Sequence, residues 1–203
     1  MVEAENTLSL CGSVHLGGLV AENLVQWQRA AQSFFELGKP GHRISGCPEL
    51  ESLACDVTKK NAFIAAAGTG WACVRAIAFN KSPSSNWSLG WHQDRTIAVA
   101  SREEQTGFAH WSIKDGVTHV EPPFEVLARM VTLRVHLDAV DDENAPLLVA
   151  DGSHRFGKVA EAGVNDLVNR PSPPVTPKQA TAGSTLPPYC TPRHALHLVV
   201  SAA

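Results

Sequence analysis

The chain has 203 residues and a formal net charge of −3 at pH 7, which suits one globular domain. No basic stripe runs through it, so nucleic acid is not expected as a partner. The sequence contains 9 histidines and only 1 tyrosine. This ratio suggests a metal site as a hypothesis, which the positions of the histidines in the sequence must support.

The cysteines indicate a reducing compartment. Their number is odd, 5, and none forms a CxxC pair, so we interpret them as free thiols. No stretch approaches the roughly 18 apolar residues of a membrane span. The N-terminus begins with acidic residues and lacks the basic and apolar regions of a secretory signal. We expect a cytoplasmic protein that does not bind membranes.

Two helices are predicted before residue 70. An amphipathic helix is expected over 19–37, where Gly38 and Pro40 end it. Its apolar residues recur at steps of three and four, namely Leu24, Trp27, Ala31 and Phe34. A second helix is expected over 48–66, ended by the glycines that follow.

Short β-rich runs separated by turn residues follow the helices. We predict strands over 72–79, 96–100, 130–137 and 146–150, and a short helix over 159–168. Helices followed by many short strands are typical of an α+β chain with a mainly β core, an antiparallel sandwich or barrel. We expect a single domain over 1–203, with a helical part over 1–70 and the β core over 71–203. Because proline cannot donate to a strand ladder, the proline-rich segment 170–193 is expected to be irregular.

The string NWSLGWHQD, which ends at Asp94, contains the most informative pair of residues. His92 and Asp94 stand two positions apart, and on a strand such residues point to the same face. Their nitrogen and oxygen donors would then converge. One more histidine from a distant strand would complete a two-histidine, one-carboxylate site with three open positions, and donors of this kind suit Fe(II).

A second HxD pattern, His136 and Asp138, means that spacing alone does not choose the site. The bland alternative for either pair is a surface histidine and aspartate beside a turn. His92 has tryptophans nearby, whereas His136 leads into the acidic run over 141–143, which is typical of a solvated turn. We therefore favour His92 and Asp94.

Three segments in series resemble the phytanoyl-CoA dioxygenase family, particularly its bacterial members. They are VRAIAFNKSPSSNWSLGWHQDRTIAV (74–99), HWSIKDGVTHVEPP (110–123) and MVTLRVHLDAVDDENAPLLVADGSHRFG (130–157). The resemblance implies a double-stranded β-helix, a cupin-like jelly roll with N-terminal helices. It implies a 2-oxoglutarate-dependent non-heme iron dioxygenase, in which decarboxylation of the co-substrate is coupled to hydroxylation of a small molecule by molecular oxygen.

The resemblance also implies roles for individual residues. His92 and Asp94 bind Fe(II), and Lys81 lies near the 2-oxoglutarate carboxylate; otherwise Lys81 is an exposed lysine at a strand end. The third ligand is His194, in Thr191-Pro192-Arg193-His194, with His197 as the alternative. The GSHR histidine, His154, is expected to be a structural member of a turn.

The C-terminal segment departs from the family pattern. Ser184 replaces an aspartate, Pro187 and Pro188 stand where a strand is expected, and no arginine follows Arg193. Similar proteins use such an arginine to clamp the far carboxylate of 2-oxoglutarate, because its planar fork matches a carboxylate. Arg134 is a candidate substitute. The alternative function is a catalytically impaired jelly-roll relative that binds metal or a small ligand without turnover.

The segment 105–119 is expected to be a loop next to the site. Trp111, Lys114 and His119 are candidates for contacting substrate. For Trp111 the competing interpretation is a core aromatic residue under the loop. A third function would be a cupin-like metalloenzyme that uses no 2-oxoglutarate. The identity of the substrate does not follow from the fold family.

Overall fold

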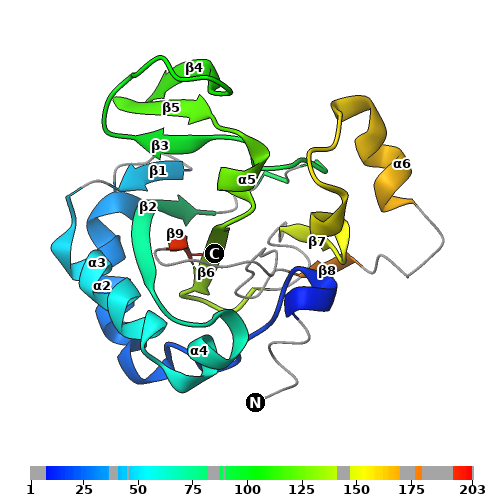
Figure 1. Ribbon diagram of the computed structural model, residues 1–203. Helices are drawn as coiled ribbons and strands as arrows, with labels where there is room; N and C mark the ends of the chain where they lie inside the picture. Colours follow the sequence, from blue (N-terminus) through cyan, green and yellow to red (C-terminus); the bar gives the residue numbers. More distant parts are fainter. Residues whose placement is uncertain are drawn as a thin grey trace.

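The computed structural model describes residues 8–36, 41–44, 46–81, 87–88, 90–140, 147–169, 177–179 and 194–202, the last two ranges by their backbone alone. It is a mixed α+β fold, in which helices cover one side of a sheet and a smaller sheet lies beyond its edge (Figure 1). The predicted α+β class is confirmed. No helix in this part of the chain is long and apolar enough to cross a membrane.

The helices lie mainly before residue 70, as predicted. A 3-10 turn, η1 (Ala21–Asn23), leads into α2 (Leu24–Phe35), so the first helix is shorter than expected. The second predicted helix is in fact two, α3 (Pro48–Thr58) and α4 (Asn61–Ala67). The break falls at Lys60, whose backbone is extended at φ −71° and ψ 138°.

The main sheet has four strands in the order β1-β2-β9-β6. These are β1 (Gly41–Ile44), β2 (Trp71–Asn80), β9 (His194–Ala202) and β6 (Met130–His136). β1 is antiparallel to β2, whereas β9 runs parallel to both of its neighbours. The last strand of the chain therefore joins two strands that are distant in sequence, and it exists despite the prolines that precede it.

A second, antiparallel sheet has the order β3-β5-β4. Its strands are β3 (Ile97–Val99), β4 (Ala109–Lys114) and β5 (Val117–Glu121). The prediction of a loop over 105–119 is wrong, because most of it is a β-hairpin. Its turn is Asp115-Gly116, where both residues have positive φ, 50° and 76°, as this hairpin turn requires.

The remaining elements are short. They are α5 (Phe124–Leu127), β7 (Leu148–Ala150), η3 (Ser153–Phe156), η4 (Glu161–Gly163), α6 (Val164–Val168) and β8 (Pro177–Gln179). The helix predicted over 159–168 is confirmed in its second half. The segment expected to be irregular, 170–193, contains β8, which pairs with β7. The rest of that segment, with Ser184, Pro187, Pro188 and Arg193, lies outside the described residues.

The two faces of the main sheet differ in chemistry. On β6, Val131, Leu133 and Val135 are buried against the helices, where the core also contains Trp27 and Leu50. The alternate β6 residues, Thr132, Arg134 and His136, are only half-buried and belong to the opposite face. That face is the one from which a polar site can be built.

The start of the described chain is fastened to η3. The Gly152 amide donates to the Cys11 carbonyl at 2.7 Å, and the Arg155 guanidinium donates to the Leu10 carbonyl at 2.6 Å. Gly12, at φ +77°, leaves room for the His154 ring, since a Cβ there would lie 2.3 Å from its Nδ1. These contacts hold one wall of the pocket described next.

Candidate metal centre

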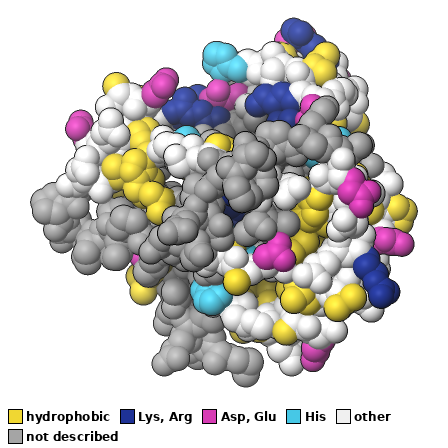
Figure 2. Space-filling model, turned by 180° about the vertical axis from the view of Figure 1, so that it is seen from behind, with side chains coloured by type: hydrophobic (Ala, Val, Ile, Leu, Met, Phe, Trp, Pro, Cys, Tyr) yellow, Lys and Arg dark blue, Asp and Glu magenta, His cyan; other side chains and the backbone are white. Residues whose placement is uncertain are grey.

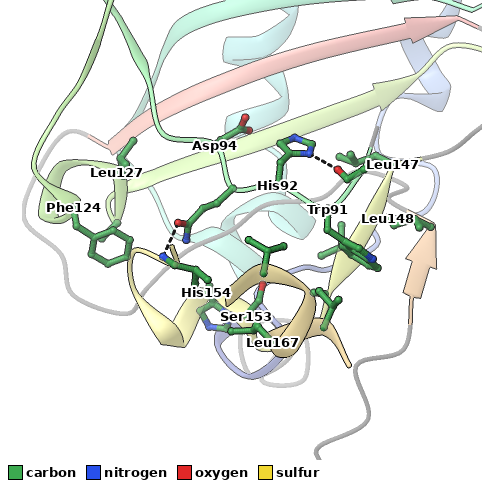
Figure 3. A pocket seen from close by; sticks show the side chains of 18 residues that line it. Trp91, His92, Asp94, Phe124, Leu127, Leu147, Leu148, Ser153, His154 and Leu167 are labelled. Carbon is green, nitrogen blue, oxygen red and sulfur yellow. Dashed lines mark hydrogen bonds between the residues drawn. The ribbon is translucent and has the colours of Figure 1, made fainter. Parts of the chain in front are cut away.

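His92 and Asp94 both line a pocket of about 240 Å³. Most of its other walls are apolar side chains of α5, β7 and α6 and of the segments beside them, namely Phe124, Leu127, Leu147, Leu148, Val149, Val159, Val164, Leu167 and Val168. Figure 3 shows the His92 ring and the Asp94 carboxylate on one side of their segment, and Ser153, His154 and Leu167 on its other side. The pocket combines two metal-type donors with a largely apolar wall.

The segment around His92 is held by its alternate residues. The Gln93 amide donates to the Gly157 carbonyl at 2.7 Å and accepts from the Val159 amide at 3.0 Å. The Arg95 guanidinium also donates to the Val159 carbonyl. His92 and Asp94 are exposed, whereas Gln93 and Arg95 are half-buried. The expected alternation of two faces is therefore present, although 92–96 does not belong to a strand ladder.

The His92 ring is oriented by its own chain. Its Nδ1 lies 2.8 Å from the Gly90 carbonyl oxygen. A proton on Nδ1 would be donated to this oxygen, leaving the Nε2 lone pair for a metal. Histidine ligands are commonly oriented in this way by a backbone carbonyl. His92 thus fits a metal-binding role, and the Asp94 carboxylate adds an oxygen donor of the kind that Fe(II) accepts.

Two arginines on the main sheet interact electrostatically with the negative charge of Asp94. Burial lowers the pKa of Arg75 on β2, and the negative charge of Asp94 acts against that change. Burial likewise lowers the pKa of Arg134 on β6, again opposed by Asp94. The Arg134 Nε is buried with no hydrogen-bond partner among the described residues. Its guanidinium lies 5.8 Å from the centre of the Phe79 ring.

Lys81, just after the end of β2, interacts electrostatically with Arg134. Its Nζ donates to the Trp87 carbonyl at 3.0 Å and lies 5.2 Å from the Trp87 ring centre. Burial lowers the pKa of Lys81, and the positive charge of Arg134 lowers it further. Lys81 and Arg134, both expected to bind the co-substrate, are therefore close enough to repel each other, and an anion between them would relieve that repulsion.

The third ligand was expected on β9, where only the backbone is described. The register pairs His197 with Arg75 on β2 and with Thr132 on β6. It pairs His194 with Trp71, a core residue that is 8% exposed. The backbone thus puts His197, and not His194, in the row of Arg75. Among the described side chains, no three His, Cys, Asp or Glu residues form a group that could hold a metal.

The second HxD pair lies elsewhere. His136 ends β6 and lines a different cavity, together with Arg134 and the segment from His15 to Leu24. Asp138 does not line that cavity and is exposed beyond the end of the strand. Leu137 between them is buried in the core at 3% exposure. The two HxD pairs therefore differ in surroundings, since only His92 and Asp94 share one pocket.

The three residues expected to contact substrate do not line the pocket of His92. Trp111 is half-buried on β4 with the Arg102 guanidinium 5.4 Å from its ring centre. Lys114 ends the same strand at the hairpin turn. His119, on β5, is 0% exposed and lines another cavity together with Arg75.

Sequence reasoning missed Arg75 and Gln93. Gln93 stands inside the HxD motif, so the period-2 alternation already implied that it faces away from the donors. Arg75 offered a weaker signal, a charged residue in an otherwise apolar strand. Its neighbour on β9 and its electrostatic partner Asp94 are set only by the fold.

Comparisons with protein-family models, with curated proteins and with solved structures found no match to this chain.

Proposed function

We propose that this protein is an Fe(II)- and 2-oxoglutarate-dependent dioxygenase that hydroxylates a small, largely apolar molecule. The observation that carries the proposal is the shared pocket of His92 and Asp94, whose other walls are mainly apolar. A nitrogen and a carboxylate donor among the lining residues of a largely apolar pocket suit a metal that reacts with a bound organic substrate. The resemblance of three sequence segments to the phytanoyl-CoA dioxygenase family supports the same reaction.

A jelly-roll core is part of this proposal. In its favour, all strands except β1 follow the N-terminal helices, they form a four-stranded and a three-stranded sheet, and β9 lies between β2 and β6. The parallel direction of β9 departs from a jelly roll, whose sheets are antiparallel. The departure falls on the strand that follows the atypical proline-rich segment.

In the proposed site, His92 and Asp94 bind the metal together with a histidine of β9, His197 or His194. When bound, the iron supplies the activation of molecular oxygen. Lys81 and Arg134 bind the far carboxylate of 2-oxoglutarate, which gives the buried Arg134 Nε an acceptor. The apolar wall orients the substrate and excludes water from the reacting centre.

The test is an anaerobic titration of metal-free protein with Fe(II), then with 2-oxoglutarate, followed by visible absorbance. We expect stoichiometric iron binding and a weak charge-transfer band that requires both additions. The Arg134→Gln variant should bind iron but need much more 2-oxoglutarate to give the band. Arg129→Gln, which removes an arginine just before β6, is the matched control and should behave as the unaltered protein.

The alternative function is a catalytically impaired relative that binds metal or a small ligand without turnover. One observation favours it: β9 contains no arginine to clamp the co-substrate, since its sequence is HALHLVVSA. Iron binding without the band would support this alternative. Absence of iron binding in the unaltered protein would contradict the dioxygenase function.

A further inference from the structure

A second cavity, of about 190 Å³, lies where the main sheet meets the three-stranded sheet. It shares no lining residue with the pocket of His92. Basic side chains enter it from three strands, Arg43 from β1, Arg75 from β2 and His119 from β5. In Figure 2, lysine and arginine side chains with acidic ones between them gather near the top, where Figure 1 places the three-stranded sheet.

The basic groups around this cavity repel one another. The positive charge of Arg43 lowers the pKa of Arg75, although burial is the larger cause. Burial also lowers the pKa of His119, and Arg43, Arg75 and Lys114 lower it further, against the hydrogen bond to Val117. Such an arrangement costs free energy unless a negative charge is added.

Two nitrogen atoms in this group are buried without a hydrogen-bond partner among the described residues, the Nε2 of His119 and the Nε of Arg43. His119 is 0% exposed, and its Nδ1 already lies 2.9 Å from the Val117 carbonyl oxygen. A buried polar group left unsatisfied is uncommon and costs free energy. Its presence in a cavity large enough for a small molecule indicates a ligand.

The acidic residues near the cavity do not cancel the positive charge of its basic side chains. Glu51 on α3 is the one acidic residue among those that line it, and it is exposed. Asp115 accepts from Arg43 Nη1 at 3.0 Å, so that pair uses a different atom from the buried Nε. Asp94 acts on Arg75 from the neighbouring pocket.

We propose that this cavity binds a small oxyanion, a carboxylate or a phosphate group, through Arg43, Arg75 and His119. Arginine presents a planar fork that matches either group. The bound charge also favours a proton on His119, so that Nδ1 donates to Val117 and Nε2 donates to the anion. None of these three residues lines the pocket of His92, so binding of the anion does not require a bound metal.

The experiment is calorimetric titration of metal-free protein with sulfate at constant ionic strength, since sulfate keeps its charge between pH 5.5 and 8. We expect saturable binding that Arg43→Gln weakens by about tenfold or more, as expected for loss of a charged hydrogen bond. Asp115→Asn should instead strengthen binding, because it removes the carboxylate that competes for Arg43. Both variants break the ion pair between Arg43 and Asp115. If loss of this pair acted only on the structure, the two variants would change sulfate affinity in the same direction.

Two further readouts test the residues and the ligand. Arg29→Gln, which removes an exposed arginine of α2, is the control and should leave sulfate binding unchanged. Binding should weaken as the pH rises from 5.5 to 8, and His119→Gln should abolish that dependence. Among natural sources, tighter binding of inorganic phosphate than of acetate identifies a phosphate ligand, and the reverse identifies a carboxylate.

The proposal is overturned if sulfate does not saturate the protein, or if Arg43→Gln and Asp115→Asn change its binding equally. Failure of iron binding would leave these results unaffected, because the titration is done without metal. The two proposals therefore fail independently.

Discussion

The pocket of His92 and the cavity of His119 lie in one small fold but are built in opposite ways. The pocket is lined by two residues of one segment, His92 and Asp94, and by apolar side chains for most of the rest. The cavity takes basic groups from three strands and has one exposed acidic residue in its wall. Both histidines have Nδ1 within 2.9 Å of a backbone carbonyl oxygen two residues earlier in the chain. The same local geometry therefore occurs in two surroundings that differ in charge.

Arg75 connects the two sites. It lines the cavity and at the same time feels the carboxylate of Asp94 in the pocket. A change in charge at one site should therefore alter ligand binding at the other. A change in apolar packing at one site should leave ligand binding at the other unchanged. The following predictions separate these effects.

The largest expected effect is on metal binding. Asp94→Asn removes the carboxylate proposed as a ligand and should weaken Fe(II) binding by more than the roughly 10–100-fold cost of losing an outer-shell partner. Equilibrium titration under anaerobic conditions measures it. Asp138→Asn, at the other HxD, is the control and should change the affinity by less than about twofold. Equal losses in the two variants would mean that the assignment of the site is wrong.

Leu50→Ala tests whether packing at the cavity stays local. Leu50 is 1% exposed, lies in the helical core and borders the cavity. Its truncation should lower the free energy of unfolding by about 2–5 kcal/mol, measured by urea denaturation. Iron affinity should not change, because Leu50 does not line the pocket. Leu10→Ala, at a residue 56% exposed, is the control with little expected loss.

Gln93→Ala tests how the donors are held in the pocket. It removes the two hydrogen bonds of the Gln93 amide, to Gly157 and Val159, and leaves the one from Arg95 to Val159. We expect unfolding to become easier by about 1–3 kcal/mol and iron binding to weaken. Gln32→Ala, which loses an exposed hydrogen bond to Glu36, should do neither. Unchanged iron affinity in Gln93→Ala would show that this clamp does not position the ligands.

The smallest expected effect is a pH dependence of stability from the ion pair between Lys158 and Glu121, outside both sites. The hydrogen bond from Lys158 lowers the pKa of Glu121 on β5, while partial burial opposes it. A lowered pKa in the folded state contributes stability above the unfolded value near 4.3, and that stability is lost as the pH falls through the folded pKa. Because Lys158 is 52% exposed, the contribution should be below about 1 kcal/mol.

Urea denaturation at several pH values between 3 and 7 measures this contribution. Lys158→Met should flatten the dependence in the acidic range. Lys59→Met, which removes an exposed ion pair with Asp56, should leave it as it is. An unaltered profile in Lys158→Met would show that other carboxylates dominate acid unfolding.

The predicted elements succeed where a local pattern is strong. The helix around Trp27 and the strands at residues 71–80 and 130–136 are present because their apolar periodicity matches a buried face. The sequence predicts a loop over 105–119, most of which belongs to the hairpin over 109–121, although the Asp115-Gly116 turn is a hairpin signal. Its strands carry polar and charged residues, such as His110 and Lys114, which hid the alternation.

For the candidate site, the sequence itself determined the pair His92 and Asp94, their common side, and the position of Gln93 between them. These three residues are close in space because they are close in the chain, whatever the fold. Only the tertiary structure decided that Arg75, Arg43 and His119 share a cavity, that Lys81 and Arg134 repel each other, and that β9 sets His197 in the row of Arg75. Those relations depend on strand order and register, which arise from pairings between residues far apart in the chain and leave no trace in local spacing.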